Sequence, residues 1–223
     1  MPLAIFCAVN NHGQTLPIGA GLLRNETRET YRWLFTCFLK AVNGQQPGSI
    51  LTDQDHWMTE ALESVMPETV DAYCIWHITQ KFPQWFRAKL GDSYASFVNR
   101  FYEVCNIEEP EYFDNAWRDF IQEYKMETDS NLQRLFSAKK KIAQCYLREY
   151  FFADMTTTQR SESINALMNR FLDSRTNLVK FSLLNSKNVF ASAIEMLLRV
   201  MLGPNNLYSF ARYRHLSAKL HRF

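Results

Sequence analysis

The first third of the chain alternates strand and helix signals, and this alternation constrains the fold more than any other feature. Apolar, partly β-branched runs flank the turn sequence Asn10–Gly13 and predict a β-hairpin. The predicted segments are, in order, strand 3–9, strand 15–23, helix 31–42, strand 49–52, helix 57–65 and strand 70–76. Residues 1–77 therefore have the pattern of an α/β fold.

Strand signals end near Ile78, and aromatic residues then recur at helical spacing as far as about Tyr150. This spacing predicts an all-helical segment over residues 78–154, large enough to pack as a subdomain. A further helix is predicted after the threonines at 156–158, with an apolar stripe along one side. A helical tail with a basic end occupies 182–223.

Composition excludes several classes of protein. The formal net charge is only +2, so bulk charge gives no argument for nucleic-acid binding. The five cysteines are odd in number and scattered, which argues against a disulfide framework and favours a reducing compartment. No apolar run approaches a membrane span, and no basic region precedes the apolar start, so neither a membrane protein nor a signal peptide is expected.

The sharpest local feature is the pair Asp53 and Asp55, directly after the apolar run 49–52. A carboxylate at a strand end is fixed by the sheet and points into the cleft beyond it. Two-metal phosphoryl chemistry uses such carboxylates to hold two divalent ions about 4 Å apart. Alternatively, both acids cap the next helix and favour its dipole. Spacing alone favours capping.

Cys74 and His77 form a Cys-x-x-His pair, which can supply half of a zinc site. Four ligands are normally required, and no second pair with suitable spacing is evident. A buried cysteine followed by a histidine at a helix start explains the pair equally well.

Glu162 lies opposite the apolar stripe of its predicted helix, beside Asn165 and Asn169. That polar face can line a cleft or face solvent, and solvent is the common fate of a helical glutamate. A basic patch near the end of the chain contacts phosphate or is simply solvated. Its members are Arg212, Arg214, His215, Lys219, His221 and Arg222.

Four motifs occur together in one order, and the ordered set is more specific than any single motif. They are Val9–Gln14, Thr52–Asp55, Cys74–Ile78 and Met155–Asn165. From about residue 2 to 181 the chain resembles the Mutator-like-element (MULE) transposase domain of the plant far-red-impaired-response and far-red-elongated-hypocotyl proteins. The tail beyond departs from the family.

The resemblance implies an RNase H-like core over 1–77, a large helical insertion over 78–154, and a core helix with the last acid over 155–181. In such transposases an Asp-Asp-Glu set binds two magnesium ions and cuts DNA. Carried over, Asp53 is the second acid and Glu162 the third, while Cys74 and His77 match the Cys-x-x-His element, a possible zinc half-site.

The first acid of the family lies on a strand upstream of the segment matching Pro2, so the core is expected to be incomplete and truncated at both ends. Loss of an acid that bridges both metals should remove most activity. The resemblance therefore implies a domesticated, non-catalytic nuclear protein related to light-signalling transcription regulators. DNA and nuclear regulatory proteins are the expected partners, with a homo- or heterodimer as the assembly. The alternatives are an active transposase core and a non-functional product.

Overall fold

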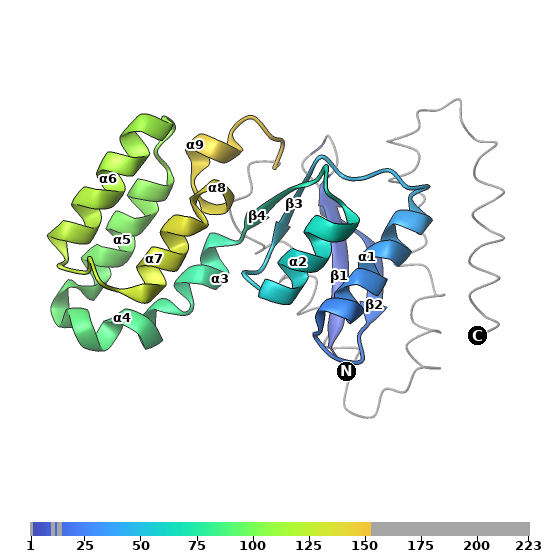
Figure 1. Cartoon of the computed structure of the whole chain (residues 1–223), viewed down its shortest axis with the longest axis horizontal. Helices are drawn as coiled ribbons and strands as arrows, with labels where there is room; N and C mark the ends of the chain where they lie inside the picture. Colours follow the sequence, from blue (N-terminus) through green and yellow to red (C-terminus); the bar gives the residue numbers. More distant parts are fainter. Residues whose placement is uncertain (1, 10–11, 13–14, 153–223) are drawn as a thin grey trace. The chain divides into compact units, whose positions relative to one another are not determined.

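The computed structural model describes residues 2–9, 12 and 15–152. The described residues divide between two compact units, the first ending at Leu22 and the second beginning at Leu23 (Figure 1). None of the helices that the structure describes combines the length and the apolar character of a membrane span. The predicted α/β class is confirmed, since strands and helices are mixed. The predicted divisions at 78, 155 and 182 stay predictions.

The described part of the first unit is the predicted β-hairpin. Strand β1 (Leu3–Val9) pairs antiparallel with β2 (Thr15–Leu22). The register shifts where Cys7 lies opposite Pro17 and Phe6 opposite Gly19, so β2 has one extra residue there. Pro17 has no backbone N–H to donate, which suits an irregular position in the ladder.

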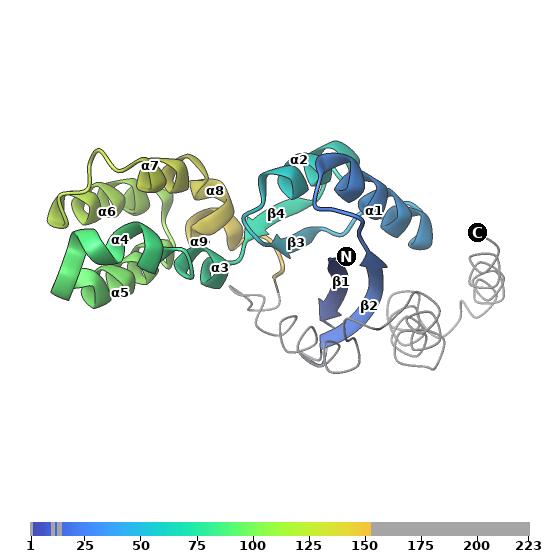
Figure 2. The same ribbon diagram turned by 90° about the horizontal axis from the view of Figure 1, so that it is seen from below.

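The second unit begins with helix α1 (Arg28–Ala41), strand β3 (Ser49–Thr52), helix α2 (His56–Val65) and strand β4 (Val70–Tyr73). The two strands are parallel, with Ser49 opposite Val70 and Thr52 opposite Tyr73. Helices α1 and α2 pack against each other, and Figure 2 shows both on the same side of the strand pair. Parallel strands joined through a helix form the βαβ unit typical of α/β proteins.

The prediction that strand 70–76 continues to Trp76 was wrong. Strand β4 ends at Tyr73, and helix α3 (Ile75–Thr79) begins after Cys74. The N–H of Cys74 makes the last ladder bond, to the carbonyl of Thr52 at 2.8 Å, and its own carbonyl then accepts from Ile78. The apolar run from Val70 to Trp76 therefore covers a strand and the start of a buried helix, which periodicity does not separate.

The remaining elements are helical, and we call α3–α9 the helical module. After α3 they are α4 (Phe82–Leu90), a 3-10 turn (Gly91–Ser93), α5 (Tyr94–Cys105), α6 (Pro110–Glu123), α7 (Ser130–Ser137), α8 (Lys139–Ile142) and α9 (Gln144–Leu147). Gly91, at φ 51°, ends α4 in a conformation that favours glycine.

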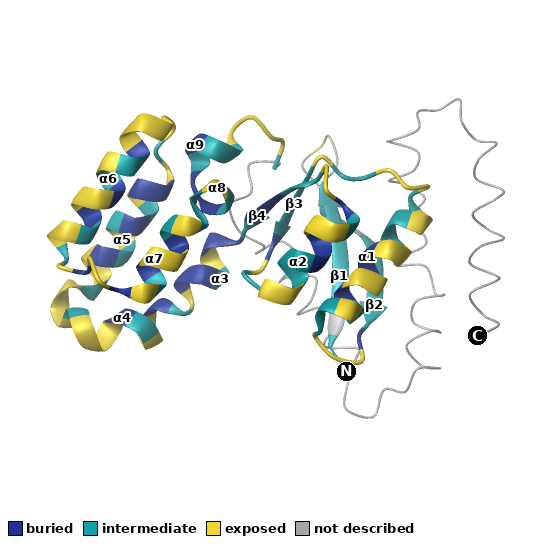
Figure 3. Ribbon diagram, in the orientation of Figure 1, coloured by how far each residue is buried: buried dark blue, intermediate teal, exposed yellow. Residues whose placement is uncertain are grey.

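The core of the helical module is aromatic. Six phenylalanines are fully buried: Phe82, Phe86, Phe97, Phe101, Phe113 and Phe120. Figure 3 shows the buried positions as stripes along the helices that face one another. Ring centroids lie 4.8 Å apart for Phe82 with Phe101 and for Phe97 with Phe120, within the range of favourable aromatic pairs.

Both ends of the helical module lie at the β3–β4 pair. Helix α3 follows β4 after one residue, and the hydroxyl of Ser49, at the start of β3, donates to the carbonyl of Phe151 at 2.5 Å. The module therefore leaves the strand pair at one end and returns to it at the other.

Candidate functional site

The candidate site lies where β3 and β4 end. Asp53 follows β3 directly, and its side chain is 51% exposed. His77, from α3, places Nδ1 2.7 Å from Oδ1 of Asp53, within hydrogen-bonding distance. The structure thus brings together two residues that the sequence singled out separately. The parallel ladder explains their proximity, because the carboxyl ends of both strands meet at one edge.

Asp53 and Asp55 have different roles in the structure. Asp55 is the N-cap of α2, and its Oδ1 accepts the backbone N–H of Met58 at 2.7 Å. The capping interpretation is therefore confirmed for Asp55. The N-cap of α2 is Asp55 alone, so that interpretation does not account for Asp53, whose carboxylate instead meets His77.

The Cys-x-x-His pair starts helix α3. Cys74 is fully buried and occupies the N-cap position, while His77 is about one-fifth exposed. The ring of Trp76 lies edge-on to His77, with centroids 4.8 Å apart. Among the residues that the structure describes, no group of three or more His, Cys, Asp or Glu side chains is placed to hold a metal ion. The predicted zinc half-site stays a prediction.

The loop after β3 is also held by a cation. Lys81, at the junction of α3 and α4, donates to the backbone carbonyl and to the side-chain Oε1 of Gln54, each at 3.3 Å. Glu162, the other predicted acid, lies outside the described residues, as does the basic patch of the tail. The loop that carries Asp53 is therefore contacted by two side chains from the start of the helical module.

Sequence reasoning missed a buried charge cluster behind this site. The side chain of Asp71, in β4, is only 4% exposed. Its Oδ1 accepts the hydroxyl of Thr52 at 2.8 Å, and its Oδ2 accepts Nζ of Lys141 at 3.2 Å. Burial raises the pKa of Asp71, and the bonds from Thr52 and Lys141 oppose that rise. The available signal was an acid inside an apolar strand run, which requires a partner.

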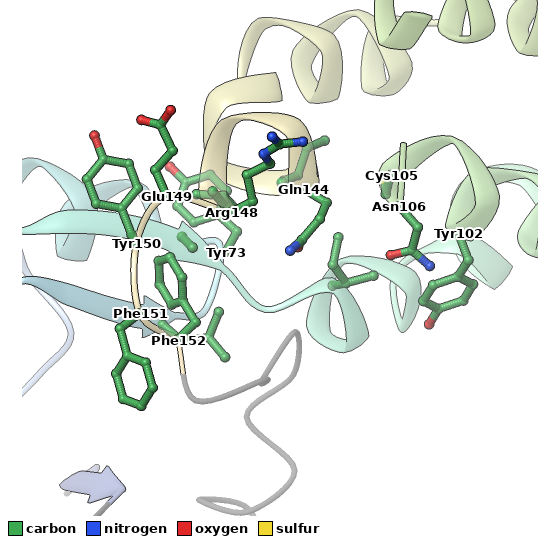
Figure 4. A pocket seen from close by; sticks show the side chains of 15 residues that line it. Tyr73, Tyr102, Cys105, Asn106, Gln144, Arg148, Glu149, Tyr150, Phe151 and Phe152 are labelled. Carbon is green, nitrogen blue, oxygen red and sulfur yellow. The ribbon is translucent and has the colours of Figure 1, made fainter. Parts of the chain in front are cut away.

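A cavity of about 660 Å³ lies between the β3–β4 pair and helices α5 and α9 (Figure 4). Its wall is part apolar and part polar, with Tyr73, Tyr102, Asn106, Gln144 and Arg148 among the labelled side chains. Arg148 is already engaged, because Nη1 donates to the carbonyl of Glu108 at 3.1 Å. The cavity does not include Asp53 or His77, so it is separate from the candidate site.

Comparison with known protein families bears on the segment that carries these motifs. Residues 1–81 match the MULE transposase domain. That match covers the hairpin, both strands of the parallel pair and the segment with Asp53, Cys74 and His77.

Several curated proteins of Arabidopsis thaliana are similar over most of the chain. FAR1-RELATED SEQUENCE 11 is 38% identical over 181 residues, which are 81% of this chain and 27% of that protein. FAR1-RELATED SEQUENCE 5 is 34% identical over 84% of this chain and 24% of its own length, and FAR-RED IMPAIRED RESPONSE 1 is 30% identical over 81% and 22%. The chain is a relative of these plant proteins, so the resemblance predicted from its motifs is confirmed. It spans about a quarter of their length.

Proposed function

We propose that the chain is a transposase-derived nuclear protein that acts through contacts with DNA and regulatory proteins, and not by cutting DNA. Two findings support this. The chain carries a MULE-type match, and one similar protein is named for an impaired far-red response. The similarity extends through the helical module as well as the strand pair.

The contact between Asp53 and His77 is the observation that supports the non-catalytic part of the proposal. A carboxylate that binds a divalent ion has to offer its oxygens to that ion. Here Oδ1 of Asp53 lies 2.7 Å from an imidazole nitrogen. A histidine N–H satisfies that oxygen without any metal. The arrangement is therefore self-sufficient as a structural contact.

For the architecture, we propose an RNase H-like core interrupted by the helical module. Strands β3 and β4 are parallel and are joined in sequence through α2, which supports this. The hydrogen bond from Ser49 to Phe151, where the chain returns from the helical module to the strand pair, supports it as well. In that architecture Asp53 and Glu162 are the acids that would hold magnesium if the chain cuts DNA.

A strand-cleavage assay tests the proposal. The full chain is incubated with supercoiled DNA and linear duplexes, with magnesium or manganese, and nicks are counted on gels. We expect no nicking above that of the Asp53→Asn variant. Asp92→Asn, in the 3-10 turn of the helical module, is the matched control. Nicking that Asp53→Asn abolishes and Asp92→Asn retains would overturn the non-catalytic proposal.

An active transposase core is the second candidate, favoured by one observation. Asp53 is half exposed at the carboxyl end of a parallel strand, which is where α/β proteins bind ligands. Magnesium would then be held by Asp53 and Glu162. The same cleavage assay separates this candidate from the first, because only an active core gives metal-dependent nicks.

Zinc, partners and location follow as separate parts of the proposal. Metal analysis of purified chain and its Cys74→Ser variant tests the zinc half-site of Cys74 and His77, and equal zinc content would reject it. Fluorescence anisotropy with labelled duplexes tests DNA binding, and light scattering tests a homodimer. A fluorescent fusion expressed in plant cells tests nuclear location.

A further inference from the structure

We propose that Lys141 is a positioning residue that connects the helical module to the candidate site through Asp71 and Thr52. Lys141 is in α8, more than sixty residues beyond the strand pair it contacts. The inference rests on the Asp53–His77 site of the proposed function, but it concerns only how that site is held.

The ammonium group of Lys141 joins three elements. It lies 2.8 Å from Oε1 of Glu63 in α2 and 3.2 Å from Oδ2 of Asp71 in β4, and it sits 5.3 Å from the ring centroid of Tyr73. Helix α8 also packs against β4. One side chain of the helical module therefore contacts both α2 and β4, the two elements that lie between Asp53 and His77 in the sequence.

The neighbouring lysines do not share this role, although all three stand in one basic run. Lys139 binds Asp114 within the helical module, with Nζ 2.6 Å from Oδ1, and Lys140 is exposed. A run of three lysines usually forms a solvated face. Here the three positions have different surroundings, so Lys140 supplies a matched control for Lys141.

Asp71 connects Lys141 to the end of β3, because it binds both Lys141 and Thr52. Its Oδ1 holds the hydroxyl of Thr52, and the carbonyl of Thr52 accepts the N–H of Cys74 in the last rung of the ladder. Asp53 follows Thr52, and His77 lies one helical turn beyond Cys74. Removal of Lys141 would leave a buried carboxylate without its cation, which is strongly unfavourable. Water could solvate that charge, or the Asp71 side chain could rotate toward solvent. Either change would weaken the hydrogen bond from Thr52 to Asp71 and the ladder bond from Cys74 to Thr52.

Amide hydrogen exchange measured by NMR tests the proposal on the full chain. In Lys141→Met, the Cys74 amide should exchange at least about tenfold faster, and the imidazole resonances of His77 should move. The amide of Phe120, inside the helical module, should keep its protection. Lys140→Met should change neither probe, and Lys141→Arg should restore most of the protection. Equal acceleration at Cys74 and Phe120, or no acceleration at Cys74, would overturn the proposal.

The route through Asp71 has its own test. Asp71→Asn keeps the side-chain shape and removes the need for a cation. In that background, Lys141→Met should change exchange at Cys74 by less than about twofold. An effect as large as in the unmodified chain would show that Lys141 does not act through Asp71. If the Lys141→Met variant does not fold, two comparisons still test the proposal. They are Asp71→Asn with and without Lys141→Met, and Lys141→Arg against the unmodified chain. None of these readouts involves DNA, so failure of the non-catalytic proposal would leave them unchanged.

Discussion

The side chain of Phe82 is the best place to measure how far the aromatic core stabilises the helical module. Phe82 is fully buried at the start of α4. Its ring centroid lies 4.8 Å from that of Phe101, 5.0 Å from Phe86, 5.8 Å from Phe97 and 6.1 Å from Trp85. Truncation of a buried phenylalanine to alanine costs about 3–5 kcal/mol. Four ring neighbours place Phe82→Ala in the upper half of that range, so we expect a loss of about 4–5 kcal/mol.

Urea unfolding followed by circular dichroism measures this loss directly. Phe82→Leu keeps most of the volume and should cost less than about 1.5 kcal/mol. Tyr112→Ala, at a side chain that is 67% exposed on α6, should change the free energy of unfolding by less than about 0.5 kcal/mol. A loss below about 1.5 kcal/mol for Phe82→Ala would refute the reasoning, because the core would then tolerate the cavity.

Three further predictions concern capping, acid stability and thiol reactivity. Asp55→Ala should lower the free energy of unfolding by about 1 kcal/mol, measured by urea titration, because α2 loses its N-cap. The pKa of Asp129 lies below its ordinary value of 3.8: burial opposes ionisation, but Lys89 and two backbone N–H groups outweigh it. Its contribution is therefore present above the ordinary pKa of 3.8 and lost as pH falls through the lower folded pKa, so Asp129→Asn should weaken the fall in stability as the pH drops below 3.8. Burial raises the pKa of the Cys105 thiol, so iodoacetamide should label exposed Cys37 and spare Cys105 in the native chain, as mass spectrometry can show.

Local patterns were sufficient for most of the described elements. The turn at Asn10–Gly13 between two apolar runs predicted the hairpin, and apolar residues at helical spacing predicted the helix over 31–42. The structure has this helix as α1, with Tyr31, Leu34 and Phe35 buried. The end of β4 was placed too late, since apolar residues continue across Cys74 into α3. The switch from strand to helix there depends on the ladder bond to Thr52, which sequence periodicity does not contain.

The sequence identified the residues of the candidate site one by one, but it did not show that they lie together. Asp53 was singled out by its place after an apolar run, and His77 by its spacing from Cys74. Their contact depends on which strands pair and in which register, and that is a property of the tertiary structure. The same limit explains why the partnership of Asp71 and Lys141 was missed, because nothing in a basic run identifies the member that reaches a buried acid.

The return of the chain from Phe151 to Ser49 has a consequence for cooperativity. Strands β3 and β4 have four residues each, and a pair so short has little stability alone. If the helical module unfolded, it would become a long flexible loop. Holding both ends of that loop at the strand pair would cost conformational entropy, which would destabilise the two attachment points. Opening of the helical module should therefore also open the edge that carries Asp53 and His77. Its protection in the native chain is set by residues far along the sequence, so substitutions deep in the aromatic core can alter this edge without touching it.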